Sequence, residues 1–165
     1  MQAAAAVAPV SDLRERVLAY LSAHTTMALA TDGPAGLWAA TILYTHEDLA
    51  LYFTSVATTR HGQNMIASGR IAGTIHDECT EWIGMKGLQL SGTITLITEF
   101  EERRRIVAGY LARFPFSVGM WHRESNVDVI ARDPGVHDFY RITPTKLYLT
   151  DNEYAPGRRL ELALD

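Results

Sequence analysis

The chain has 165 residues, of which 47% are hydrophobic and 21% are charged, and it carries a formal net charge of −4. These values fit one soluble globular domain with a sizeable core, and the negative charge argues against broad nucleic-acid binding, which needs a positive field. The single cysteine, Cys79, excludes an internal disulfide and fits a reducing compartment.

The start of the chain, residues 1–10, is rich in alanine and contains Pro9. It lacks the basic region and the long apolar region of a secretory signal, and no apolar run approaches the ~20 residues that span a bilayer. We therefore expect residues 1–10 to form a flexible tail and residues 11–165 to form one domain. We also expect the protein to be cytoplasmic, without a membrane partner.

The first predicted helix begins at Ser11, a residue type that caps helices. Leu13, Val17 and Leu21 follow at every fourth position and give this helix one apolar stripe. Segments rich in Thr, Ile, Leu and aromatic residues come next, separated by turn residues. They predict three consecutive antiparallel strands, over Thr25 to Ala30, Gly36 to Tyr44 and Leu49 to Thr54.

The most informative stretch joins an apolar strand to a short helix. The strand ends in Thr54 and Ser55, and the helix, predicted over Thr59 to Ser68, carries Arg60 and His61 in its first turn. A helix N-terminus has free N–H groups and a partial positive charge, so it suits a phosphate, and arginine adds a planar fork for phosphate oxygens. Cations are disfavoured there unless an anion is present. The pattern therefore favours a phosphorylated ligand over the alternative of solvated first-turn residues.

The segment from Gly87 to Thr98 alternates strictly between apolar and polar residues, which predicts a strand with one core face. Its polar face, with Gln89, Ser91 and Thr93, is either a wall that meets a ligand or partner subunit, or the solvated side of an antiparallel strand. A shorter strand is predicted before it, from Ile71 to His76.

The C-terminal half is predicted to contain one helix and two strands. Thr98 and Glu101 form a capping-box pattern at the start of the helix, and Pro115 ends it. The segment 116–136 is predicted to be a long loop, either irregular throughout or with one helical turn, and Trp121 either anchors it or covers a cofactor. The two strands, and a later turn into a short tail, are expected over His137 to Ile142, Lys146 to Thr150 and Pro156 to Gly157.

Two further groups of polar residues have structural interpretations. The His-Asp-Glu-Cys run at 76–79 lacks a second pair with ligand spacing, so we predict no metal site and expect Cys79 to be a buried thiol or an interface residue. The basic run Arg103 to Arg105 follows acidic residues on the same helix, which predicts mutual ion pairs on a solvated face.

Six or seven short strands with a few helices predict a mainly β fold, a small antiparallel barrel decorated by helices. Within such a fold, the order of motifs resembles the FMN-binding split barrel of pyridoxamine 5′-phosphate oxidases. The step Tyr52-Phe53-Thr54-Ser55, followed by Thr59-Arg60-His61, resembles that family's aromatic-Tyr-Thr-Asn step and its Ser-Arg-Lys triplet at nearly the same spacing. The segment from Lys86 to Gly92 resembles the family strand that begins with Arg-Gln.

A closer resemblance is to the UPF0306 branch of the same superfamily, and it covers roughly residues 11 to 162. The shared steps read Thr58-Thr59-Arg60-His61, Gly87-Leu88-Gln89-Leu90-Ser91-Gly92, Arg113-Phe114-Pro115 and Thr150-Asp151-Asn152. Their order along the chain is more specific than any one of them.

The resemblance implies an FMN site shared between the two protomers of a homodimer. Arg60 and His61 would lie at the FMN phosphate, and His61 in place of the usual Lys would make the charge pairing pH-dependent. The resemblance also implies that Thr59 belongs to the triplet and that Thr54 and Ser55 line the ribityl-phosphate path. Thr41 and Tyr44 would lie on the strand beside the flavin ring, and Lys86 and Gln89 on the strand that reaches the flavin across the dimer interface.

The resemblance implies an FMN-dependent oxidoreductase, with no residue put forward as a catalytic acid or base. The oxidases carry an Arg-x-His-like group near the C-terminus, where this chain has Arg159, Glu161 and Ala163, which argues against vitamin B6 oxidase activity. The alternatives are a non-catalytic binding module for a flavin, haem or deazaflavin, and a dimeric scaffold with an empty pocket.

Overall fold

The computed structural model describes residues 10–34, 36–121 and 124–164, so the expected tail lies outside the described residues except for Val10. The helices are α1 (Val10–Ala23), α2 (Arg60–Ser68), α3 (Phe100–Arg113) and α4 (Val127–Arg132), with 3-10 turns η1 (Trp82–Gly84) and η2 (Pro115–Trp121). The strands are β1 (Thr26–Thr31), β2 (Trp38–Leu43), β3 (Thr45–Glu47), β4 (Ala50–Val56), β5 (Arg70–His76), β6 (Lys86–Leu96), β7 (His137–Asp151) and β8 (Arg159–Glu161).

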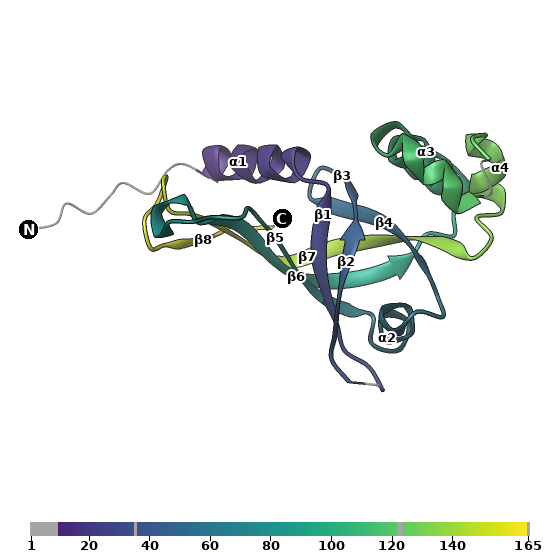
Figure 1. The fold of residues 1–165 in the computed structure, drawn as a ribbon, viewed down its shortest axis with the longest axis horizontal. Helices are drawn as coiled ribbons and strands as arrows, with labels where there is room; N and C mark the ends of the chain where they lie inside the picture. The colour runs from purple at the N-terminus through teal and green to yellow at the C-terminus, as the bar shows by residue number, and fades with distance from the viewer. Residues whose placement is uncertain (1–9, 35, 122–123, 165) are drawn as a thin grey trace, which may run out of the picture.

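One antiparallel sheet forms the body of the molecule, with strand order β2-β1-β5-β6-β7-β4-β3 and with β8 paired to β7. The sheet curls into a half-closed barrel, and α1, α3 and α4 lie on the opposite side of it from α2 (Figure 1). The predicted mainly β split barrel with decorating helices is therefore confirmed. Its seven-strand path and the added β8 exceed the predicted number slightly.

The prediction of three consecutive paired strands is correct for β1 and β2 and wrong for β4. β1 and β2 form a hairpin, but β4 pairs with β7 and with the short β3. The reason is a tight turn at Asp48, whose φ of 50° lets β3 fold back on β4 before the chain can return to β2. Among the described residues β2 therefore pairs only with β1, and the sheet stays open between β2 and β3.

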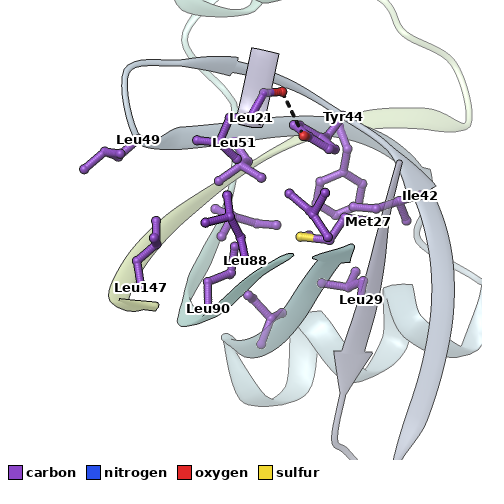
Figure 2. Packing of buried hydrophobic residues seen from close by; sticks show 14 of the residues in the cluster. Leu21, Met27, Leu29, Ile42, Tyr44, Leu49, Leu51, Leu88, Leu90 and Leu147 are labelled. Carbon is purple, nitrogen blue, oxygen red and sulfur yellow. Dashed lines mark hydrogen bonds between the residues drawn. The ribbon is translucent and has the colours of Figure 1, made fainter. Parts of the chain in front are cut away.

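The interior of the barrel is filled by leucines, isoleucines and aromatic residues from α1 and from nearly every strand. Figure 2 shows these side chains converging, with Met27 and Leu29 of β1 facing Leu88 and Leu90 of β6. The predicted apolar stripe of α1 is confirmed, because Val17 and Leu21 lie in this cluster. A second cluster lies beneath α3 and α4 and contains Val107, Tyr110, Phe114, Trp121, Ile130 and Phe139.

Two predicted helix starts differ from the structure. α1 already begins at Val10, so the predicted first residue, Ser11, lies within the helix. The N-cap of α3 is Glu99, which makes no side-chain capping bond, so the predicted capping box of Thr98 and Glu101 is wrong. The guanidinium of Arg103 instead donates to the carbonyls of Ile97 and Thr98, with nitrogen–oxygen distances of 2.9 and 3.2 Å for Nη2.

The C-terminal half is more regular than predicted. The two expected strands form one continuous β7, because Pro144 lies at a register shift opposite Gly92, where a proline removes no ladder bond. The segment expected to be a loop contains η2 and α4, and Trp121 anchors it by stacking on Phe139. After the turn at Gly157 the chain forms β8 against β7, so it does not run off as a tail.

Candidate functional site

The turn from β4 into α2 is built by Thr59 and Gly62. Thr59 is the N-cap in extended conformation, and its Oγ1 accepts the N–H of Gly62 at 3.1 Å while donating to the carbonyl of Val56 at 2.8 Å. A Cβ on Gly62 would lie only 2.6 Å from that carbonyl, so the turn requires glycine. Gly69, with a φ of 63°, ends the helix. The predicted helix is confirmed, and its first two N–H groups have no intrahelical acceptor.

His61 turns back over the end of β4. Its Nε2 lies 2.7 Å from Oγ of Ser55 and 3.3 Å from Oγ1 of Thr59. The neutral ring accepts the Ser55 proton when its own proton is on Nδ1, whereas the Nε2–H tautomer and the charged ring donate to the hydroxyl. Burial lowers the pKa of His61, because the surroundings disfavour the charged imidazolium. Ser55, which is only 6% exposed, therefore contacts a ring whose neutral form is favoured by burial.

Arg60 leaves α2 on the other side and reaches the loop before β2. Its Cζ lies 4.6 Å from the centroid of the Trp38 ring, and its Nη2 lies 3.4 Å from the carbonyl oxygen of Leu37. The Arg60 side chain is exposed. Arg60 and His61 thus flank the positive end of α2, where Arg60 supplies a cation and His61 supplies an imidazole.

Thr54 has a different role from its neighbour Ser55. Its Oγ1 lies 3.1 Å from the carbonyl oxygen of His137 and 3.0 Å from that of Asp138, both on β7. A hydroxyl has one proton, and these carbonyls take it. Thr54 therefore fastens β4 to β7, and it can offer a ligand only a lone pair.

A groove of about 530 Å³ lies on the outer face of the sheet, beside the β1–β2 loop. Its size falls within the range of small-molecule and cofactor sites. The groove does not include Ser55, Thr59 or His61, but Leu37 lines it and also contacts Arg60 through its carbonyl. Its lining is mostly small or apolar and comprises Ala30, Thr31, Asp32, Leu37, Ser68, Arg70, Ile71, Ala72, Ser91, Gly92, Thr93 and Thr145.

Thr41 and Gln89 lie on this same outer face. The strand register forms a lateral row from Thr41 through Ala28 and Thr74 to Gln89. A parallel row of small residues runs from Ala39 through Ala30 and Ala72 to Ser91. Side chains in such rows point to one side of a sheet. The face is therefore lined by small and polar side chains, and it includes Gln89, whose Oε1 accepts from Arg159 at 3.1 Å.

The structure separates Tyr44 and Lys86 from this group. The side chain of Tyr44 is 0% exposed and its hydroxyl donates to the carbonyl of Leu21 at 2.9 Å (Figure 2), so it is a core residue without a surface for a cofactor. Lys86 lies three positions from Gln89 and therefore faces the other side of β6, where its Nζ pairs with Asp151 at 3.1 Å. The two residues expected on the strand that reaches the flavin therefore lie on opposite faces of it.

Sequence reasoning assigned no role to Leu37 or Trp38, and it quoted Asn64 only as part of a motif. Asn64 is 1% exposed, and its Nδ2 donates to the carbonyl of Gly36 at 3.1 Å and to Oγ1 of Thr31 at 3.3 Å. The available signal was an amide on the apolar side of an amphipathic helix. Trp38 gave no such signal, because one aromatic residue in a strand is ordinary.

The polar run at 76–79 begins at the last residue of β5. Asp77 pairs with Nε2 of His24 at 2.6 Å, and Cys79 is exposed, so the expectation of a buried thiol is wrong. Within residues 10–34, 36–121 and 124–164, no three His, Cys, Asp or Glu side chains come together to hold a metal. In the same ranges, no helix is long and apolar enough to cross a membrane.

Comparison with known proteins agrees with this architecture. A family model described as pyridoxamine 5′-phosphate oxidase matches residues 13–151. The UPF0306 protein of Photorhabdus laumondii is 29% identical over 103 residues, which cover 61% of this chain and 71% of that protein. The predicted resemblance to both groups is therefore confirmed.

Solved structures show the same fold at low sequence identity. HutZ, the haem storage protein from Vibrio cholerae, superposes with a TM-score of 0.66 at 13% identity, covering 83% of this chain and 94% of HutZ. An FAD-binding protein from Mesorhizobium loti superposes with a TM-score of 0.61 at 15% identity, covering 81% and 90% of the two chains. Proteins with this fold thus carry different cofactors.

Proposed function

Because the chain belongs to the pyridoxamine 5′-phosphate oxidase family, we propose that it binds FMN through the start of α2 and works as a flavin-dependent oxidoreductase. The observation that carries the proposal is the start of α2, where Arg60 and the His61–Ser55 pair lie at a capped helix N-terminus with no acidic residue in its first turn. This donor set fits a phosphate monoester, which needs positive charge and several N–H or O–H donors.

In this proposal each residue has one task. Arg60 offers its planar guanidinium to the phosphate, and His61 adds a second donor that becomes charged as it binds. Ser55 orients the imidazole, while Thr59 shapes the helix start. Thr54 stays fixed to β7, so it lines the path without donating.

The small side chains of the outer face support a homodimer, which we include in the proposal. Exposed rows of alanine, serine and threonine allow a second copy to approach closely, and the groove beside Leu37 then becomes enclosed between protomers. Thr41 and Gln89 lie on this face and would reach the flavin ring from one or the other protomer. We also propose a cytoplasmic location, where an exposed thiol such as Cys79 stays reduced.

Bound FMN would supply the hydride or electron transfer, and the described residues bind, orient and enclose it. The C-terminal positions argue for a substrate other than a B6 phosphate. Glu161 pairs with Lys146 at 2.7 Å, and Arg159 is turned toward Gln89 and the Tyr148 ring. A carboxylate at 161 disfavours an anionic substrate in that place.

A second candidate is a binding module that stores or senses its cofactor without catalysis. The likeness to HutZ, a haem storage protein, favours haem for this alternative, and a deazaflavin would use the same phosphate site. A dimeric scaffold with an empty pocket is the third possibility.

The visible spectrum of the purified protein tests these proposals, together with a titration of FMN followed by quenching of flavin fluorescence. The oxidoreductase gives a flavin spectrum that NAD(P)H bleaches and air restores. A Soret-type band, or a flavin that exchanges no electrons with any donor, supports the binding module. Colourless protein that leaves FMN fluorescence unchanged contradicts both and supports the scaffold.

A further inference from the structure

The loop between β1 and β2 lies against α2 and presents Trp38 to Arg60. The indole is 43% exposed although it is the largest apolar side chain of β2, and one of its faces carries the guanidinium at 4.6 Å. Leu37, its neighbour, is 78% exposed and turns its carbonyl oxygen toward the same cation at 3.4 Å. Both residues therefore contact the same cation, and the core leaves much of each exposed.

The position of this loop is set by Asn64, which belongs to the same helix as Arg60. Its amide donates to the carbonyl of Gly36 and to the hydroxyl of Thr31, which lies directly opposite Trp38 in the β1–β2 register. A Cβ on Gly33 would lie 2.3 Å from Oδ1 of Asn64, so the close approach of loop and helix requires glycine. α2 therefore holds the loop through Asn64 and contacts the indole through Arg60, one turn earlier in the helix.

Stacking leaves the useful donors of an arginine untouched. A guanidinium over an indole face is attracted by the ring quadrupole, while its N–H groups point outward in the guanidinium plane. A cation held in this way loses less freedom when it binds phosphate than one that moves freely in water. An aliphatic side chain in the same place would provide contact but little attraction to the charge.

We propose that Trp38 is a positioning residue for Arg60 and thereby sets the preference of the site for a phosphorylated flavin over its dephosphorylated form. The inference rests on the proposed function, since it assigns the Arg60 guanidinium to the flavin phosphate. Trp38, the first residue of β2, would thus act on the ligand through Arg60 without touching it.

A double-mutant cycle on the full chain tests the inference with two probes, FMN and riboflavin. The variants are Trp38→Leu, Arg60→Ala and both together, and affinities come from quenching of flavin fluorescence. Trp38→Leu is expected to weaken FMN binding about three-fold, as an exposed cation–π contact would, and to leave riboflavin binding unchanged. In the Arg60→Ala background the same change is expected to have no further effect on FMN. Trp38→Phe keeps an aromatic face and is expected to recover most of the affinity.

Each other outcome overturns the inference in a distinct way. If Trp38→Leu weakens FMN and riboflavin equally, the indole supports the ring or the loop and not Arg60. If its effect adds fully to that of Arg60→Ala, the two residues act independently. If Arg60→Ala weakens FMN binding but Trp38→Leu does not, only the inference fails. If neither change alters FMN affinity, the proposed phosphate site fails with it. Thermal unfolding of each variant, with Trp38→Phe as the milder change, separates these outcomes from loss of fold.

Discussion

The starts of α2 and α3 carry opposite charge patterns, although both helices begin directly after a β-strand segment. α3 has Glu101 and Glu102 in its first turn, as the positive end of a helix dipole favours. α2 has no acidic residue there and begins with Arg60 and His61. Alone, this arrangement opposes the dipole, so it gains its favourable energy from something outside the helix.

The arginines of α3 show what a structural use of charge looks like. Arg104 pairs with Asp128, Arg105 with Glu47, and Arg103 donates to backbone carbonyls, so the predicted mutual pairing along the helix is wrong. Partners on other elements are reached because α3 packs beside α4 and β3. The arginines of α3 thus link that helix to other elements of the fold, whereas Arg60 and His61 of α2 lie around a helix end suited to an anion.

The largest expected effect compares one arginine from each helix start. Arg60→Ala should weaken FMN binding by about ten-fold to a hundred-fold, because it removes charge-assisted hydrogen bonds worth about 1.5–3 kcal/mol. Arg104→Ala, the matched control, should leave FMN affinity unchanged. Titration of FMN by fluorescence quenching measures both. Equal affinities in the two variants would remove the distinction between the helices.

The next effect compares the glycines of the two helices. Gly62→Ala should destabilise the protein by about 1–3 kcal/mol, since the added Cβ meets the carbonyls of Val56 and Ala57. Gly109→Ala in α3 meets nothing within 4 Å and should stabilise it by about 0.5–1 kcal/mol. Urea unfolding followed by circular dichroism gives both values. Destabilisation at Gly109 would show that α3 is also constrained.

Helix capping provides a smaller contrast. Thr59→Ala removes the hydroxyl that accepts the N–H of Gly62 and should cost about 1 kcal/mol of the free energy of unfolding. Glu99→Ala at the N-cap of α3 removes no side-chain capping bond and should change it by less than about 0.5 kcal/mol. The same urea transitions compare the two changes. A larger loss at Glu99 would contradict the capping assignment.

The smallest effect is a pH dependence that only the α2 site should show. The pKa of His61 is lowered by burial in the free protein, and a bound phosphate would raise it. Binding therefore takes up a proton, and FMN affinity should increase about three-fold as the pH falls from about 8 to about 6.5. Below about pH 6 the phosphate itself gains a proton, so the useful window ends there. His61→Gln should abolish the slope, and a slope that persists would assign it to another group.

Much of the fold was predictable because its signals are local. The alternation of β6 and the short helix that follows β4 each depend on residues close together in the sequence, and each was confirmed. The pairing of β4 with β7 was not predictable, because it joins segments more than eighty residues apart. Which strand pairs with β4 depends on how the whole sheet closes.

The candidate site divides in the same way. Ser55, Thr59, Arg60 and His61 are close in sequence, so one motif was enough to bring them together. Tyr44 was misplaced because a tyrosine at the end of a strand gives no indication of whether its hydroxyl meets solvent or, as here, the end of α1. Trp38 contributes through a loop fixed by Asn64, and such a contact depends on tertiary packing alone.

The turn between β5 and β6 contains Cys79, which offers a test of the proposed homodimer. Cys79 is the sole thiol of the chain and is open to solvent, so a spin label attaches at one defined point without any substitution. In a twofold assembly the two labels share a single separation, and pulsed electron resonance would return one narrow distance distribution. The same thiol makes storage under reducing conditions advisable, because two such turns can oxidise to a crosslink unrelated to the native contact.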